Sequence, residues 1–382
     1  MGLCMLLLML LTALPESFSK VSDFDWKVDV DFPGNDVQQI YSPDVYHCQL
    51  ACTQHHSCRF FTFIRPDWDK DDRQFYCYLK NTASGYPSVV NNLKGVTSGF
   101  PLNRKEYTAH TCLSAQHKDV EFTGTDYRNM AVSSSNECQE LCTSDPHCKF
   151  FSYFPEKFSD AEKRKKCFLK YSWTVPTPPT VGMKSEVWSG FSQSLVSKET
   201  SEEACKEQIY PHSDYFDSDF EQLLAASPQH CQFLCTLHPR CTHFSYLTFK
   251  HQTSNTWYHM RCFLKHKPDI SSDELIKKME SYCGLPTRNC EHSNVWATTQ
   301  YADVDFPGFD NHFVLLDDHN ACQQQCTADP DCQFYTYVYS SFSDPVYRRR
   351  CYLKQVMTLP RPVKVVSNQS VISGFSLKSC KS

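Results

Sequence analysis

Short apolar segments recur along the chain and are separated by polar stretches. One class of segment is rich in aromatic residues and comprises residues 60–63, 150–153, 243–246 and 334–337. A second class has the pattern Cys-aromatic-Leu-Lys and comprises residues 77–80, 167–170, 262–265 and 351–354. Short segments of this composition, bounded by polar residues, are typical of β-strands. We therefore expect both classes to lie in antiparallel sheets.

A helix is expected before each pair of predicted strands. Cys48 and Cys52 are four positions apart, which places both side chains on one face of an α-helix. The preceding Ser42-Pro43-Asp44 is typical of a helix start, with the proline near the first helical position. The pattern predicts an α+β fold in which one helix packs against an antiparallel sheet in each unit.

The cysteines show that this unit occurs four times. Each unit has a quartet of cysteines with intervals of 4, 6 and 19 positions, except that the last interval is 21 in the third unit. The first cysteines of successive quartets are 90, 93 and 91 residues apart, and a Ser-Gly-Phe triplet closes three units, at 98–100, 189–191 and 373–375. The third unit lacks the triplet. A fixed period of this kind predicts four tandem domains, at residues 20–104, 105–197, 198–284 and 285–382.

The N-terminal segment and the cysteine content indicate an exported protein. The apolar run 6–14, followed by Ser17-Phe18-Ser19, predicts a signal peptide over residues 1–19. No other stretch has the roughly 18 apolar residues that a membrane-spanning helix needs. The sequence has 22 cysteines, of which Cys4 lies in the predicted signal peptide. The other 21 are expected to form disulfides in an oxidising compartment, and their spacing does not fit zinc sites. We expect a secreted, extracellular protein.

Charge and motif content argue against nucleic-acid binding and against catalysis. The net charge of -5 is spread along the chain, without the broad basic field that nucleic-acid binding requires. The sequence has no Gly-Asp-Ser-Gly segment, and none of its 16 histidines lies in a triad-like context. Phosphate-binding glycine loops are also absent. We expect no enzyme activity, no catalytic residues, no metal site and no cofactor.

The four copies of these motifs resemble the apple (PAN) domain family, and in particular the heavy chains of plasma kallikrein and coagulation factor XI without their protease domain. In that family the first cysteine of the helix pairs with the strand cysteine, and the second pairs with the nearby third. The resemblance implies eight disulfides: Cys48–Cys77, Cys52–Cys58, Cys138–Cys167, Cys142–Cys148, Cys231–Cys262, Cys235–Cys241, Cys322–Cys351 and Cys326–Cys332.

Beyond the predicted signal peptide, five further cysteines lie outside the quartets: Cys112, Cys205, Cys283, Cys290 and Cys380. The resemblance implies that such cysteines join the ends of a domain. We favour Cys205–Cys283 and Cys290–Cys380, which leaves Cys112 without a partner in the chain. An odd cysteine in a secreted protein often forms an intermolecular bond, so a disulfide-linked homodimer through Cys112 is one hypothesis. The alternative assignment joins Cys112 to Cys205.

The resemblance also extends to fish mucus lectins of the kalliklectin type, which bind mannose. It implies a secreted, mannose-type lectin that binds glycans on microbial surfaces in innate defence. Four similar domains would strengthen such binding by avidity. The alternative is an interaction module of the contact-coagulation kind, which binds a kininogen-like protein or heparin.

Candidate sugar contacts lie in two related segments, 28–34 and 302–308. Each segment is interpreted as a strand that ends in a Pro-Gly turn. Carboxylate and amide groups beside aromatic residues also suit sugar hydroxyls, and on this interpretation the contacts are Asp31, Asn35, Asp305 and Asp310. Asn368 is a glycosylation acceptor that we expect in a polar loop before the last Ser-Gly-Phe.

Overall fold

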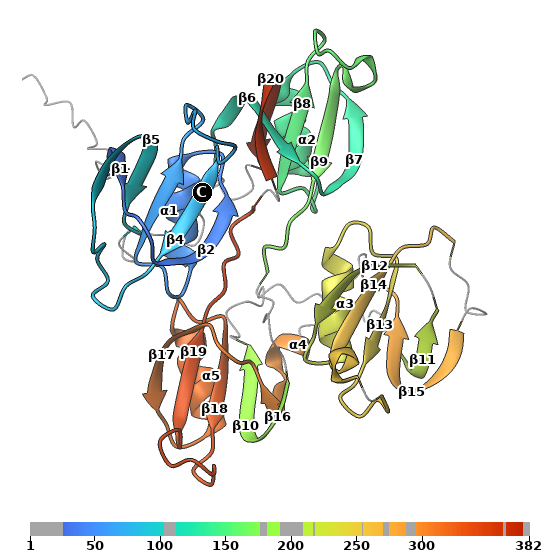
Figure 1. The fold of residues 1–382 in the computed structure, drawn as a ribbon. Helices are drawn as coiled ribbons and strands as arrows, with labels where there is room; N and C mark the ends of the chain where they lie inside the picture. The colour runs from blue at the N-terminus through green and yellow to red at the C-terminus, as the bar shows by residue number, and fades with distance from the viewer. Residues whose placement is uncertain are drawn as a thin grey trace, which may run out of the picture.

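The residues that the structure describes form four antiparallel sheets of five strands each (Figure 1). The structure is a computed structural model that describes residues 26–102, 112–175, 182–191, 209–216, 218–253, 255–269, 275–287, 295–361 and 364–376. Each sheet has the same order of strands. The closing strand lies between the first and third strands, and the fourth strand lies between the third and second.

The first and third domains are each built from one continuous stretch of chain. The first contains β1 (Lys27–Asp31), β2 (Asp36–Tyr41), α1 (Val45–Gln54), β3 (Phe60–Ile64), β4 (Tyr76–Lys80) and β5 (Asn91–Gly99). The third contains β11 (Ile209–Tyr215), β12 (Asp219–Leu224), α3 (Pro228–Leu237), β13 (His243–Leu247), η3 (Thr256–Tyr258), β14 (Arg261–Lys265) and β15 (Leu275–Gly284).

The second and fourth domains exchange their closing strands. The second contains β6 (Gln116–Thr123), β7 (Asp126–Ala131), α2 (Ser135–Ser144), β8 (Phe150–Phe154), η1 (Ala161–Lys163) and β9 (Lys166–Lys170). The fourth contains α4 (Val295–Thr298), β16 (Gln300–Asp305), β17 (Asp310–Leu315), α5 (His319–Ala328), β18 (Phe334–Val338) and β19 (Arg350–Lys354). The strand that follows β9 in sequence, β10 (Gly182–Phe191), joins the fourth sheet, whereas the C-terminal β20 (Lys364–Phe375) joins the second.

Figure 1 makes this exchange visible, because the red β20 lies between the green strands β6 and β8, and the light-green β10 lies among the orange strands. The four contiguous domain ranges predicted from the sequence do not include this exchange of strands. Each exchanged strand is an inner strand that pairs on both sides, β20 with β6 and β8 and β10 with β16 and β18.

The exchange is possible because the closing strands carry the same Ser-Gly-Phe triplet. The serine hydroxyl of the triplet is buried and lies beside a hydroxyl of the neighbouring strand. The distance is 2.7 Å from Ser98 of β5 to Thr62, 2.8 Å from Ser189 of β10 to Thr336 and 2.8 Å from Ser373 of β20 to Ser152. The glycine is required because an added Cβ would lie 2.9, 2.8 and 3.0 Å from the aromatic side chains of Phe61, Tyr335 and Phe151 respectively. A closing strand can therefore pair within the sheet of another domain as it would within the sheet of its own.

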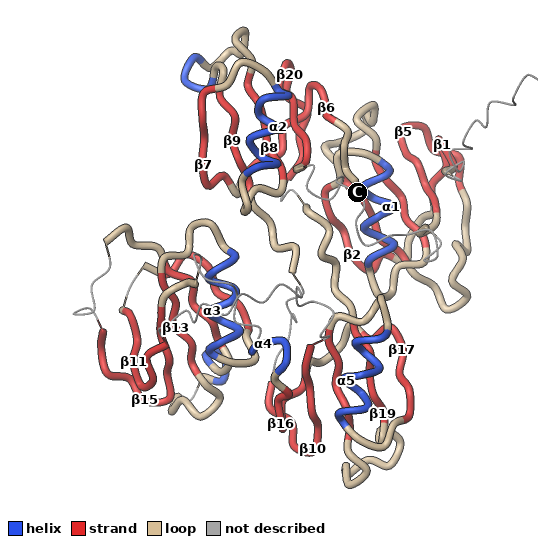
Figure 2. The backbone as a smooth tube through the Cα atoms, turned by 180° about the vertical axis from the view of Figure 1, so that it is seen from behind, coloured by secondary structure: helices blue, strands red, loops and turns tan. Residues whose placement is uncertain are grey.

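Each ten-residue helix begins with the same kind of cap. The N-cap residues are Asp44, Ser134, Ser227 and Asp318, and each side chain accepts a hydrogen bond from the backbone N–H three positions on. The expected proline near the helix start is at the first helical position only in α3, since Pro43 precedes the cap of α1. Figure 2 shows each helix lying along one face of its sheet.

Disulfides fix each helix to its sheet. The structure joins the first cysteine of every quartet to the fourth and the second to the third, which are the eight bonds that the resemblance implies. The cysteines of the quartets lie in the cores of the domains, and none is more than 4% exposed. Closing loops of these lengths is worth about 2–4 kcal/mol per bond.

Two expectations for the remaining cysteines are wrong. Cys283 is a buried free thiol, so it does not pair with Cys205. Cys283 lies inside β15 opposite Ser245, where the other domains have the serine of the Ser-Gly-Phe triplet. Cys283-Gly284-Leu285 therefore occupies the place of that triplet in the third domain. Cys112 is disulfide-bonded, so it is not left over for a bond to a second chain.

The expected Cys290–Cys380 bond lies outside the described residues, as does the signal peptide at 1–19. No helix among the described residues is long and apolar enough to cross a membrane.

Candidate functional site

A pocket lies where the first three domains meet. It has a volume of about 660 Å³ and is lined by β2 of the first domain, by the segment after β9 of the second, and by β12 and the loop after α3 of the third. Arg361, from the segment that connects β19 to β20, completes the lining. The pocket therefore depends on how the domains are arranged.

Two aromatic side chains of the second domain form one wall. The backbone N–H of Tyr171 donates to the carbonyl oxygen of Thr125 at 3.2 Å, which holds the segment after β9 against the domain. Trp173 packs against the core of the third domain, and its indole Nε1 donates to Oε1 of Glu221 at 2.7 Å. The segment thus presents both rings to the pocket and links two domains.

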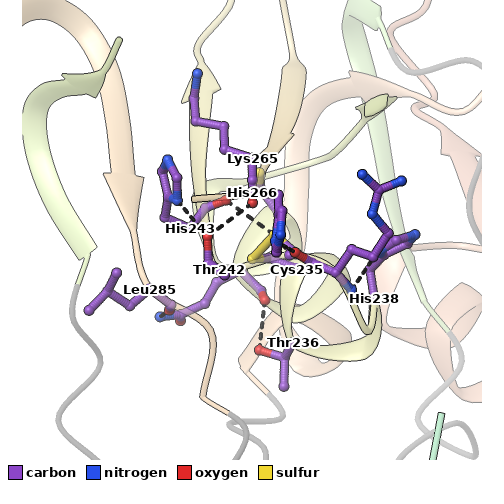
Figure 3. The surroundings of a disulfide bond; sticks show 12 residues. Cys235, Thr236, His238, Thr242, His243, Lys265, His266 and Leu285 are labelled. Atoms are coloured by element: carbon purple, nitrogen blue, oxygen red, sulfur yellow. Dashed lines mark hydrogen bonds between the residues drawn. A yellow bond between two sulfur atoms is a disulfide. The ribbon is translucent and has the colours of Figure 1, made fainter. Parts of the chain in front are cut away.

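A disulfide-closed loop of the third domain lines the pocket next to these two rings. The Cys235–Cys241 bond closes this loop, and Figure 3 shows His238 on it. The backbone of His238 donates to Leu234 and accepts from Cys241, both at 3.1 Å. The imidazole ring then lies among three aromatic rings, with centroid distances of 4.9 Å to Tyr171, 5.6 Å to Trp173 and 4.8 Å to Phe220.

Arg361 is held in place through its backbone. Its N–H donates to the hydroxyl of Ser172 at 3.2 Å. The residues just before it are fixed to α1, because the Leu359 N–H donates to Oε1 of Gln54 at 2.7 Å and the Pro360 carbonyl lies 2.9 Å from Nε2 of His47. The guanidinium of Arg361 is half-buried, and this burial lowers its pKa.

The pocket has more positive than negative charge to offer a ligand. Glu221 is engaged by Trp173 and lies 3.4 Å from Nε2 of His238, and burial raises the pKa of its carboxyl. Arg240 lies over the ring of Phe220 at 5.0 Å from its centroid. No carboxylate among the described residues forms an ion pair with Arg240 or Arg361. The pocket can therefore stack a ring, donate hydrogen bonds and hold an anion.

The four predicted sugar contacts lie in two turns that belong to different domains. Asp31 ends β1 and accepts a hydrogen bond from the Thr62 hydroxyl at 3.2 Å, and Asn35 is an exposed turn residue with φ +60°. Asp305 ends β16 and lies 3.5 Å from Nζ of Lys184 on the exchanged strand β10. The turns follow their strands as expected, with Gly34 and Gly308 at φ +75° and +76°. The structure does not bring the two turns together in the pocket.

Asp310 has a structural partner. It forms an ion pair with Lys354, the lysine of the Cys-aromatic-Leu-Lys strand, whose side chain is 3% exposed. The same pair recurs in the other domains as Lys80–Asp36, Lys170–Asp126 and Lys265–Asp219. This recurrence indicates that Asp310 joins the second strand of its sheet to the fourth.

The glycosylation acceptor Asn368 lies in a strand and not in the expected loop. Residues 364–375 form β20, and Asn368 lies where its pairing with β6 is interrupted between Ser367 and Ile372. The amide of Asn368 donates to Oε2 of Glu121 at 2.6 Å, which leaves the side chain half-buried. The residue is therefore less accessible than a loop position would be.

Sequence reasoning missed the residues of the pocket, although one signal was present. In the other three copies the positions after the Cys-aromatic-Leu-Lys motif carry no aromatic residue, whereas the second copy has Tyr171-Ser172-Trp173. This departure from the repeat could have been noticed. The contribution of Arg361 depends on the strand exchange and could not. Across the described ranges, no group of three or more metal-binding side chains comes together.

Comparisons with known proteins give the family. Models of the PAN domain match residues 30–80, 112–195, 205–290 and 291–380. Coagulation factor XI of Bos taurus is 32% identical over 356 residues, which are 92% of this chain and 56% of that protein. Micronemal protein 4 of Toxoplasma gondii is 26% identical over 323 residues, 83% of this chain and 49% of that protein. This chain thus spans about half the length of each relative.

Among solved structures, the two N-terminal apple domains of Toxoplasma gondii microneme protein 4 match at 20% identity with a TM-score of 0.14, covering 39% of this chain and 75% of that one. The conclusion about family rests on the matched domains and on the similarity to factor XI. The chain belongs to the PAN (apple) domain family.

Proposed function

We propose that this chain is a secreted carbohydrate-binding protein without catalytic activity, and that its ligands are glycans on microbial surfaces. The observation that carries the proposal is the pocket of about 660 Å³ between the domains, where aromatic rings and polar side chains face one space. Sugars bind such sites because their C–H faces pack on aromatic rings while their hydroxyls bond to amide, carboxylate and guanidinium groups. Gln38 and Gln39 of β2 also line the pocket and carry side-chain amides.

Mannose is the sugar that the resemblance to the kalliklectins supports. The Pro-Gly turns are a second location for neutral sugars, through Asp31 and Asn35 in the first domain and Asp305 in the fourth. Sites repeated along one chain would bind a dense glycan surface much more tightly than a single sugar.

The test is retention on immobilised yeast mannan, with and without calcium, followed by elution with free mannose. In the full chain, Trp173→Ala should weaken glycan binding about tenfold, because it removes a stacking surface worth about 1.4 kcal/mol. The matched control is Trp257→Ala, which removes a 44% exposed tryptophan that does not line the pocket. Wild-type protein that binds no glycan, or equal effects of the two variants, would contradict the proposal.

The alternative function is binding to a kininogen-like protein or to heparin. It predicts retention on heparin that is abolished by salt and unaffected by free sugars. That result, together with no retention on mannan, would favour the alternative over carbohydrate recognition.

A further inference from the structure

Two arginines, Arg240 and Arg361, line the pocket. The acidic residues that line it are already occupied, because Glu221 accepts from Trp173 and lies beside His238, and Asp126 is paired with Lys170. Arg240 and Arg361 have no ion pair with any residue that the structure describes. A cationic group placed in a partly desolvated cavity favours an anion from outside.

The cost of burying Arg361 supports a binding role. A half-buried guanidinium without a partner costs free energy, and the Arg361 side chain donates no hydrogen bond to another residue that the structure describes. Its backbone is tied to Ser172 and its neighbours to α1, so the side chain is placed beside the pocket by fixed contacts. A carboxylate can accept two parallel hydrogen bonds from such a group.

The rest of the pocket selects a ring-bearing ligand. Tyr171, Trp173 and Phe220 provide aromatic surface next to the two arginines. The volume of about 660 Å³ is in the range of small-molecule sites, which leaves room for a short oligosaccharide. A free inorganic anion would contact the two arginines but not the three aromatic rings, which we call the aromatic wall.

We infer that the pocket binds a carboxylate-bearing sugar, with Arg361 and Arg240 on the carboxylate and the aromatic wall against the ring. This inference rests on the proposed carbohydrate-binding function and narrows it to acidic glycans at this site. Sialic and uronic acids share the required chemistry. The strand exchange places Arg361 at the pocket, because this residue lies in the segment between β19 of the fourth domain and β20 of the second.

The experiment measures binding of the full secreted chain to 3′-sialyllactose and to a glucuronic-acid disaccharide by calorimetry. The matched ligands are lactose and the carboxyl-reduced disaccharide, which keep the rings and lose the charge. We expect the acidic member of at least one pair to bind at least tenfold more tightly, and the pair that responds identifies the source of the carboxylate. Added salt should weaken this binding.

Variants separate the pocket from general charge effects. Arg361→Gln should weaken binding of the acidic sugar at least tenfold, and Arg361→Lys should restore part of it. Arg59→Gln is the control, because it removes one exposed positive charge that does not line the pocket and should change affinity less than twofold. Thermal unfolding of each variant checks that its fold is intact.

The outcomes are distinct. Retention on mannan with no preference for the acidic ligands would overturn the inference and leave the proposed function standing. Binding to no glycan of any kind would overturn the proposed function itself. Equal losses in Arg361→Gln and Arg59→Gln would show a diffuse charge effect and also refute the assignment of the pocket.

Discussion

Cys283 shows how the environment of a single residue decides its chemistry. The equivalent residues in the other sheets are Ser98, Ser189 and Ser373, whose buried hydroxyls each bond to a hydroxyl on the neighbouring strand. Cys283 occupies the same place opposite Ser245 and is fully buried. Burial raises the pKa of its thiol to about 12, so the reactive thiolate is suppressed.

Replacing Cys283 by serine should therefore be tolerated. We expect Cys283→Ser to change the free energy of unfolding by less than about 1 kcal/mol, because serine already serves at this position in three domains. Cys77→Ser, which breaks the Cys48–Cys77 bond, is the matched control and should cost about 2–5 kcal/mol. Thermal unfolding measures both, and alkylation of the native protein should leave Cys283 unmodified. Loss of a disulfide from the Cys283→Ser protein would contradict this account.

At the scale of the elements, the lysine of each fourth strand joins two strands. These lysines are 3–4% exposed, and each pairs with an aspartate that begins the second strand of its sheet. Burial lowers the pKa of Lys170, whereas the Asp126 carboxylate acts in the opposite direction. A buried ammonium is stable only while this partner is present.

Asp310→Asn should consequently destabilise the fourth domain. Removing the charge leaves Lys354 buried without a counter-ion, at a cost of about 1–3 kcal/mol, since the carboxylate is itself partly exposed. Asp317→Asn is the control in the same domain, because Asp317 is 85% exposed in its ion pair with Arg349, and it should cost below about 1 kcal/mol. Urea unfolding compares the two. A stable Asp310→Asn protein with weakened glycan binding would instead favour the sugar-contact interpretation of Asp310.

At the scale of the whole molecule, the exchange couples the domains in pairs. The phenylalanine of β20, Phe375, stacks on His47 of the first domain at 5.4 Å between ring centroids. The phenylalanine of β10, Phe191, contacts His230 of the third domain at 5.0 Å. Each histidine is at the third position of its helix. The same contact thus joins the first domain to the second and the third to the fourth.

These histidines make the assembly sensitive to acid. Burial lowers the pKa of His47 to about 4 and that of His230 to about 3, from an ordinary value of 6.5. The unfolded chain therefore takes up protons below pH 6.5 while the folded chain does not. The contribution of these two groups to the free energy of unfolding is therefore largest above pH 6.5. It falls by about 1.4 kcal/mol per pH unit for each histidine as the pH decreases from 6.5 towards the pKa of that histidine in the folded chain.

Urea midpoints between pH 7 and pH 5 test this dependence. His47→Gln with His230→Gln should give a shallower loss of stability, and the remaining slope should come from groups such as His55 and His117, whose pKa values burial also lowers. Replacing the exposed His212 by glutamine should leave the slope unchanged. An unaltered slope in the double variant would refute this role of the two histidines.

The exchange also accounts for the unequal distribution of terminal cysteines. Cys112 begins the second domain, which has no closing cysteine in its own stretch of sequence, and Cys380 follows β20, which enters that domain. Gly374 pairs with Gln116 in antiparallel register, so the C-terminal end of β20 lies beside the start of β6, close in sequence to Cys112. We expect Cys112–Cys380, and peptide mapping of the unreduced protein would detect it. A Cys290–Cys380 or Cys112–Cys205 peptide would show that this expectation is wrong.

The sequence by itself determined what is local and repeated. The cysteine intervals and aromatic segments predicted the four α+β units, and the resemblance supplied the pairing within each quartet, because these contacts lie within about 30 residues and recur unchanged. Only the tertiary structure decided which domain each Ser-Gly-Phe strand enters. The triplets at 189–191 and 373–375 carry the same serine, glycine and phenylalanine, so local sequence gives either strand an equal fit. The same exchange brings Arg361 into the pocket.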